Sequence, residues 1–388
     1  MAKTKYNKKE ILAAWGFLTP NFIGFLIFTL IPVVFSMIMA FTNWNIFGKP
    51  TFIGIENFIN LLGFHEEGGK QVPNDPFFWQ YLYNTVYLLI GIPLGIFSSL
   101  ACALIMNQKL KGIVFFRTIY FLPSVAGGVA MLVLWKYMFN HEIGLINQTL
   151  RSCGAFLYGN PILGFLTTFI GMLLWGAFLV CCIACAVSFI KWVLDKTKAD
   201  IPEHVWNIIT IAIGAVIFIL LCCRFVTYND IIKSFFIEPP DWLGTVAWAK
   251  PSFIIMGLWG GLGGGNMILY LAALSGVSAS LYEAAEIDGA NNWKKFWSIT
   301  WPMISPTTFY IFIMGVIGGL QSGFMNAKVM TNGGPAGSTS TVEYYLFNTA
   351  FQNFNMGYAS SIAWFLFVII LILTLITWKV GGQVVTYE

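Results

Sequence analysis

The chain has 388 residues, of which 57% are hydrophobic and only 10% are charged, and its net charge is +4. Soluble globular domains carry about 25% charged residues, so this composition excludes an ordinary soluble domain. An aromatic content of 17% also excludes a disordered or low-complexity chain. The basic residues are scattered rather than gathered in one stripe, which gives nucleic-acid binding no support. A polytopic membrane protein is the class that fits.

Eight apolar stretches are long enough to cross a bilayer as helices, for which about 20 residues are needed. Backbone polar groups must be satisfied internally in lipid, so we expect an all-α polytopic membrane protein. The basic N-terminal segment precedes an apolar run that is too long for a cleaved signal. The excess of Lys and Arg in alternate loops predicts that both termini are cytoplasmic. The expected spans are 14–42, 81–107, 113–138, 164–190, 205–226, 251–274, 303–325 and 358–379.

The positions of the charged residues bear on the source of energy. All 17 carboxylates fall in the expected tails and loops, whereas ion-coupled carriers usually need an ionisable group within the membrane. The sequence also lacks a phosphate-binding GxxxxGK[ST] loop, so the chain is not expected to be its own ATPase. Energy for any transport is therefore expected from a partner.

The cysteines and histidines give no sign of a metal site or of catalysis. Most of the seven cysteines lie in apolar runs, where a thiol behaves as a small hydrophobic group. The three histidines, His65, His141 and His204, fall in expected loops away from any serine or cysteine motif. We therefore expect no catalytic residues, no bound metal and no cofactor on this chain.

Residues 278–306, between the sixth and seventh expected spans, form the most informative cytoplasmic loop. Good helix formers lead to a break at Gly289, and a second amphipathic stretch with Trp293 and Trp297 leads to Pro302. On physical grounds two interpretations are open. The first helix could enter a groove on another protein, or the loop could be a connector that lies on lipid headgroups.

The run Glu283-Ala284-Ala285, followed by Asp288-Gly289-Ala290 and by Pro302 and Pro306, resembles the EAA loop of binding-protein-dependent ABC importer permeases. In that family the loop forms a coupling helix that docks into a cytoplasmic ATPase dimer, which binds ATP and Mg²⁺. The resemblance implies that the ATPase-coupling positions are Glu283, Ala284, Ala285, Asp288, Gly289 and Ala290.

Other segments are similar to the MalF-like sugar permeases, among them Trp15-Gly-Phe-Leu-Thr-Pro20, Gly144-Leu-Ile-Asn147 and Thr331-Asn-Gly-Gly-Pro335. The similarity covers about 1–150 and 240–380, and implies a six-helix permease core with two inserted spans. We therefore divide the chain into a tail and first span (1–42), an outer loop and core spans (43–153), an inserted pair (154–238) and a core segment with the coupling loop (239–388). Peripheral packing or lipid contact is the default role of the insertion, and contact with a partner protein is the alternative.

The sixth and seventh spans hold the candidates for a substrate pathway. Six of the ten residues from Gly257 to Asn266 are glycine, with several GxxxG spacings. They predict either tight packing against a neighbouring permease or a pore-facing helix with room for a sugar. Polar groups near the end of the seventh span either contact a sugar or bond to neighbouring helices, since an unpaired one is costly in the membrane. The candidate pathway residues are Gly257, Trp259, Gly261, Gly264, Asn266, Gln321, Ser322 and Asn326.

The resemblance implies a permease subunit of an ATP-driven importer for a carbohydrate, a monosaccharide or an oligosaccharide, in a bacterial cell membrane. Its expected partners are a second, different permease subunit, a cytoplasmic ATPase dimer, an extracellular or periplasmic substrate-binding protein and membrane lipid. The alternatives are the same machine with another cargo such as glycerol phosphate, an ion-coupled carrier, and a membrane scaffold.

Overall fold

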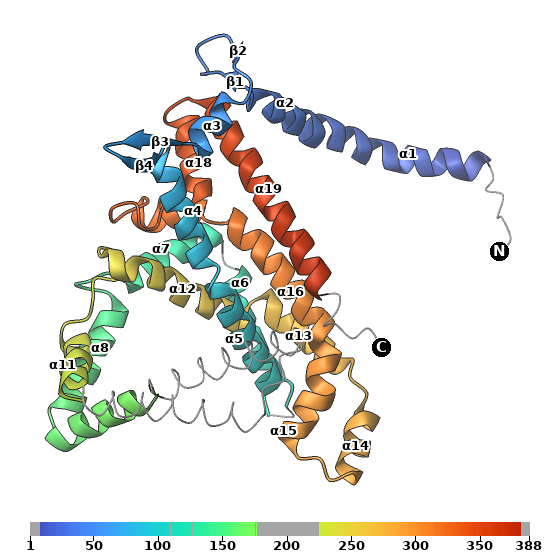
Figure 1. Ribbon diagram of the computed structural model, residues 1–388. Helices are drawn as coiled ribbons and strands as arrows, with labels where there is room; N and C mark the ends of the chain where they lie inside the picture. The colour runs from blue at the N-terminus through green and yellow to red at the C-terminus, as the bar shows by residue number, and fades with distance from the viewer. Residues whose placement is uncertain (1–7, 109–110, 126, 175, 177–224, 382–388) are drawn as a thin grey trace, which may run out of the picture. The chain divides into compact units, whose positions relative to one another are not determined.

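The structure is a computed structural model that describes residues 8–108, 111–125, 127–174, 176 and 225–381 (Figure 1). It is predominantly helical, which confirms the all-α polytopic class. Within the described part, five helical segments are long and apolar enough to span a membrane, and a bent pair of helices would make a sixth. The five are Leu12–Met39, Pro76–Met106, Val246–Ser275, Asn292–Gln321 and Met356–Lys379.

The chain divides into two compact units, one made of Met1–Trp135 and Leu243–Glu388 and the other of Lys136–Trp242. The proposed insertion 154–238 falls within the second unit. The two expected spans of that insertion, 164–190 and 205–226, lie largely outside the described residues.

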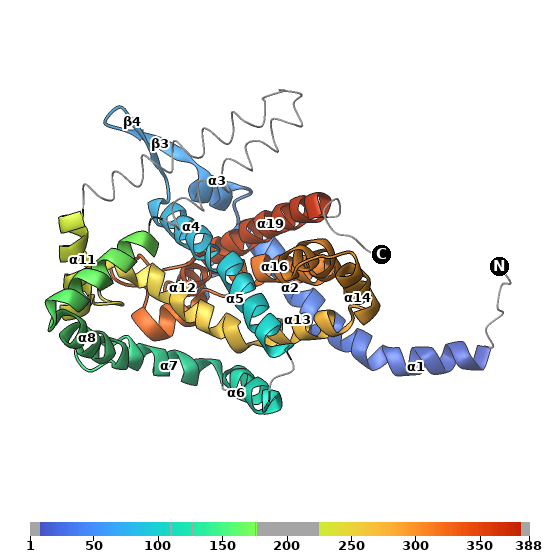
Figure 2. The same ribbon diagram turned by 90° about the horizontal axis from the view of Figure 1, so that it is seen from below.

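The core of the first unit forms where three helices meet, α5 (Gly91–Met106), α13 (Gly265–Ser275) and α16 (Trp301–Gln321). Their buried faces carry Leu100, Met267 and Ile304, and the helices lie side by side in both views (Figures 1 and 2). The buried Tyr270 donates its hydroxyl hydrogen to Thr308 Oγ1 at 3.1 Å, which satisfies the phenol and links α13 to α16. Helix α12 (Val246–Gly263) packs along α5.

A second cluster joins α3 (Glu56–Leu62), α4 (Pro76–Leu88), α18 (Val342–Phe351) and α19 (Met356–Gly381) around Leu61, Phe78 and Ile362. The buried Asp75 caps α4 by accepting from Phe78 N at 3.0 Å. Its other oxygen accepts from Tyr345 at 2.7 Å and from Tyr358 at 2.6 Å. One carboxylate therefore joins the start of α4 to α18 and α19.

The first expected span is confirmed as a helix, made of α1 (Lys8–Phe25), the π-helical η1 (Leu26–Leu30) and α2 (Ile31–Met39). It contacts α19, where Trp364 Nε1 donates to Ser36 Oγ at 3.2 Å. Two short antiparallel sheets follow it. One pairs β1 (Thr42–Asn43) with β2 (Thr51–Phe52), and the other pairs β3 (Phe64–Glu67) with β4 (Lys70–Pro73).

The expected span 113–138 is wrong as a single helix. It is divided into two shorter helices, α6 (Ile113–Val125) and α7 (Gly128–Met138). Pro123 cannot donate a helical hydrogen bond, and Gly127 and Gly128 are weak helix formers, so the helix ends here despite its apolar sequence. The expected span 251–274 is helical but broken at Gly264, whose backbone is extended (φ −79°, ψ −169°).

In the second unit, α8 (Leu145–Tyr158) packs against α11 (Phe225–Ile237). A further helical segment, Pro161–Leu174, is bent by 117° from α8. The buried amide of Asn147 accepts from Trp242 Nε1 at 2.6 Å, and the Trp242 ring lies edge-on to Phe235. These contacts fix the ends of the unit to each other.

Candidate functional site

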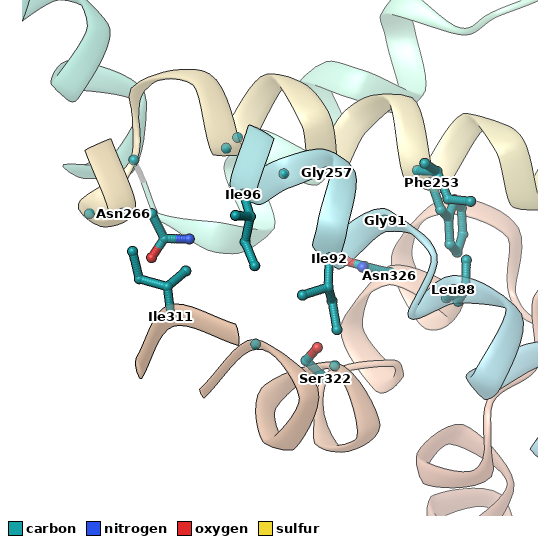
Figure 3. A pocket seen from close by; sticks show the side chains of 18 of the residues that line it. Leu88, Gly91, Ile92, Ile96, Phe253, Gly257, Asn266, Ile311, Ser322 and Asn326 are labelled. Atoms are coloured by element: carbon teal, nitrogen blue, oxygen red, sulfur yellow. The ribbon is translucent and has the colours of Figure 1, made fainter. Parts of the chain in front are cut away.

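The first cavity of the first unit lies between α4–α5, α12–α13 and α16 and has a volume of about 380 Å³. Figure 3 shows the amide of Asn266 and the hydroxyl of Ser322 pointing toward a space that Ile92 and Ile311 border. Ten of its lining residues are glycines: Gly91, Gly95, Gly257, Gly260, Gly261, Gly264, Gly265, Gly315, Gly319 and Gly323.

These glycines serve two different purposes. A Cβ added at Gly261 would lie 3.0 Å from Ser98 Oγ and 3.2 Å from Gly95 Cα, so this glycine lets α12 approach α5 closely. A Cβ at Gly257 or Gly260 would meet nothing within 4 Å, so those glycines face open space. Close packing within the chain and space for a ligand are therefore both built from the same glycine-rich run.

The second cavity is larger, about 1200 Å³, and its walls come from α6, α7, α12 and the residues that follow α16. Trp135 and Trp259 meet edge to face in its wall, with ring centroids 6.3 Å apart. Stacked or edge-on aromatic rings offer broad apolar surfaces, to which the polar groups of Gln321 and Asn326 are added here. The cavity thus combines aromatic surface with amide and hydroxyl groups.

All eight candidate pathway residues line at least one of these cavities. Gly257, Gly261 and Asn266 line only the first, and Trp259 and Gln321 only the second. The remaining three, Gly264, Ser322 and Asn326, line both. Their contact with a substrate stays a prediction.

Glu343 is a lining residue of the second cavity that the sequence pattern did not single out. It lies in the first turn of α18, where its Oε2 accepts from Phe324 N at 2.7 Å. Burial raises the pKa of the Glu343 carboxyl, and hydrogen bonds from the N–H groups of Phe324 and Gly323 offset part of that rise. The only signal in the sequence was a lone acidic residue between two apolar stretches.

The loop 278–306 folds as the expected helix, break and second helix. Helix α14 (Ala279–Ile287) ends at Gly289, whose φ of +75° favours glycine. Ala290 N donates to Ala285 O at 2.9 Å and Gly289 N donates to Glu286 O at 3.0 Å, the paired bonds that close a helix C-terminus. Helix α15 (Asn292–Lys295) and the π-helical η2 (Phe296–Thr300) then lead into α16.

Two side-chain contacts join α14 to α15 and η2, the segment that leads into α16. The hydroxyls of Tyr282 and Thr300 lie 2.8 Å apart, and Lys295 Nζ pairs with Glu286 Oε1 at 2.7 Å. The hydrogen bond and charge of Lys295 lower the pKa of the Glu286 carboxyl. The segment that α14 contacts leads directly into α16, the helix whose far end lines both cavities.

The six candidate coupling residues lie together at the end of α14. Glu283, Ala284, Asp288 and Gly289 are exposed, while Ala285 and Ala290 are half-buried. Ile287, next to Asp288 in the sequence, is 87% exposed and was not among the predicted residues. In the part of the chain that the structure describes, no group of His, Cys, Asp and Glu could hold a metal ion.

The comparisons with known proteins found relatives along the whole chain, although no family model matches it. The probable ABC transporter permease protein YesP of Bacillus subtilis is 29% identical over 392 residues, covering 100% of this chain and 96% of YesP. The lactose transport system permease protein LacF of Rhizobium radiobacter is 28% identical over 366 residues, covering 93% of this chain and 91% of LacF.

A solved structure shares the fold. It is a chain of a bacterial alginate ABC transporter, crystallised in complex with a periplasmic protein bound to an alginate pentasaccharide. The TM-score is 0.64 at 18% identity, and the match covers 97% of this chain and 96% of the other.

Proposed function

The relatives of this chain are permeases of ABC transporters, among them lactose and multiple-sugar permeases, consistent with the MalF-like family, and from that premise we propose that it is a transmembrane permease subunit of an ATP-driven carbohydrate importer. The observation that carries the proposal is similarity to the lactose and multiple-sugar permeases over 93% and 95% of the chain. The chain would form half of the translocation pathway. The two cavities, with their aromatic, amide and hydroxyl groups, suit a sugar.

Energy would enter through the exposed end of α14. In this proposal, ATP binding closes a partner ATPase dimer, which holds ATP and Mg²⁺ and receives Glu283, Ala284, Ala285, Asp288, Gly289 and Ala290 in a groove. The movement passes to α16 through the Tyr282–Thr300 and Glu286–Lys295 contacts. Hydrolysis then resets the chain. Such coupling requires two arrangements of the helices, one opening the pathway to each side.

The remaining partners follow from the same proposal. A second permease subunit would complete the pathway, and an extracellular or periplasmic binding protein would deliver the sugar from outside. The chain would lie in a bacterial cell membrane with both termini in the cytoplasm, which places α14 beside the ATPase.

The competing functions have less support. The five long apolar segments that the structure describes contain no Asp or Glu, which disfavours an ion-coupled carrier. A scaffold protein would not need two cavities with polar linings. Glycerol phosphate as cargo would need a cation in the pathway, whereas neither cavity lining contains Lys, Arg or His.

The test is co-purification of the full-length tagged chain from its native cell in mild detergent, with the partners identified by mass spectrometry. The variant is Glu283→Ala combined with Gly289→Pro, because proline cannot adopt the positive φ of residue 289. Glu66→Ala, on the exposed strand β3, is the matched control.

We expect an ATPase and a second permease with the wild type and the control, and loss of the ATPase alone with the double variant. Retention of the second permease shows that the variant is folded. Absence of an ATPase from every sample would remove the energy source and refute the proposal.

A further inference from the structure

The lining of the second cavity contains a negative charge and no positive charge. That lining includes one carboxylate, Glu343, and no Lys, Arg or His, and the lining of the first cavity contains no ionisable side chain. The amides of Gln321 and Asn326 and the hydroxyl of Ser322 in the same lining are neutral. The net charge of the lining groups in this half of the pathway is therefore set by Glu343.

The position of this carboxylate is fixed. Glu343 belongs to the first turn of α18, whose cap is Thr341, and its Oε2 accepts from Phe324 N at 2.7 Å. That bond holds the carboxylate beside the segment 321–326, which lines the cavities. A half-buried carboxylate tied to the backbone cannot turn away from a ligand without losing a charge-assisted hydrogen bond.

Three basic residues belong to the helices that wall the second cavity, Arg117 in α6, Lys136 in α7 and Lys250 in α12, and none of them lines either cavity. Lys250, in α12, donates to Asn84 Oδ1 at 3.1 Å, and its ammonium lies 4.8 Å from the centre of the Tyr83 ring. It faces α4 and lines neither cavity. The charge of Glu343 is therefore not paired with this cation.

We propose that Glu343 makes this half of the pathway selective for carbohydrates without acidic groups and against uronates and sugar phosphates. This inference rests on the proposed function, a carbohydrate importer, and specifies which class of carbohydrate it takes up. Sugar hydroxyls can donate to the fixed carboxylate, whereas a second anion in a partly dehydrated cavity is repelled by it. The solved structure with the same fold, by contrast, comes from an importer of the acidic polysaccharide alginate. The fold itself therefore does not decide whether the cargo is acidic or neutral.

The electrostatic part is tested with charged thiol reagents on the full chain in native membranes. Met325→Cys, in a chain whose native cysteines are replaced by alanine, places a thiol in the second cavity, where residue 325 is 51% exposed. The measured quantity is the rate ratio of a cationic trimethylammonium-ethyl and an anionic sulfonatoethyl methanethiosulfonate. The ratio is normalised to that of the Glu66→Cys variant, in the exposed strand β3.

We expect the cationic reagent to be favoured by about tenfold, the effect of one unit charge at several ångströms in a medium of intermediate dielectric constant. Glu343→Gln keeps an oxygen for Phe324 N and should bring the ratio to near unity. A ratio near unity in the wild type, or an unchanged ratio in Glu343→Gln, would overturn the proposal.

The cargo class is tested by supplying cells with a mixture of neutral disaccharides and the matching uronic-acid disaccharides. Mass spectrometry of the medium compares cells that lack the gene with complemented cells. Depletion of neutral sugars alone supports the proposal, and depletion of the acidic members overturns it. If an ATPase co-purifies while acidic sugars are taken up, the selectivity proposed for Glu343 is refuted and the importer function is not. If no ATPase co-purifies and neither class of sugar is depleted, the importer function itself is refuted.

Discussion

Gly263 stands at the crossing of α12 and α6, in the wall of the second cavity, and its replacement by alanine tests how that wall is built. A Cβ at this position would overlap the carbonyl oxygen of Tyr120, and would lie 2.7 Å from its carbonyl carbon and 3.1 Å from its Cα. All three atoms belong to backbone, so no side-chain rotation can relieve the contact. The helices must separate.

The magnitude follows from these distances. Carbon atoms normally approach to about 3.5–4.0 Å, so α6 must move by at least about 1 Å, and the overlap with the carbonyl oxygen requires more. Inserting a methyl group into a packed site costs about 1–3 kcal/mol, and alanine recovers at most about 1 kcal/mol by its higher helix propensity. We expect Gly263→Ala to lose about 1–2 kcal/mol of stability and part of the transport activity.

The matched control is Gly260→Ala, one turn earlier in the same helix, where an added Cβ meets nothing within 4 Å. It should leave thermal stability unchanged or raise it slightly. The assay is the thermal denaturation midpoint of the purified chain in detergent, followed by size-exclusion chromatography. Equal midpoints for the two variants would refute the close approach of α6 and α12.

Three further predictions follow from other contacts. Tyr282→Phe and Thr300→Ala should each weaken ATP-driven uptake. The double variant should take up no less than either single variant, because all three lose the same hydrogen bond. Losses of uptake that add in the double variant would contradict the contact. Asp75→Asn should lower the unfolding free energy by about 2–3 kcal/mol, since an amide cannot accept from both tyrosines and Phe78 N. The measurement is denaturation in detergent. An unchanged midpoint would show that Asp75 does not stabilise the junction of α4, α18 and α19. Because burial raises the pKa of the Glu343 carboxyl, the cation preference of the second cavity should be lost on acidification at a higher pH than an ordinary carboxylate would lose it. Rate ratios measured as the pH is lowered should decrease in the wild type and stay flat in Glu343→Gln, and parallel profiles of the two proteins would contradict this role of Glu343.

Hydropathy predicted the long spans well because burial in lipid is a property of composition. It failed at 113–138, where the backbone properties of Pro123, Gly127 and Gly128 divide an apolar stretch into two helices. The break at Gly264 was missed for the same reason, because a hydropathy window does not register which residue leaves the helical conformation.

The cavity residues could be predicted because glycine and amide side chains are unusual in a span. Glu343 could not be predicted, since its position depends on how the chain returns after Ser322 and places the first turn of α18 beside Phe324. The coupling positions were identified by resemblance. The contact between Tyr282 and Thr300 could not be predicted, because the two residues are 18 positions apart and on separate helical segments that only the fold brings together.

The breaks at Gly264 and at Ser322–Gly323 interrupt the two helical segments that enclose the cavities, and both places contribute to both linings. A helix whose ladder of hydrogen bonds is interrupted bends more easily there than elsewhere. We therefore expect these two segments to bend more readily at the cavity walls than where Asp75 joins α4 to α18 and α19. A bend at either position would change the shape of both cavities.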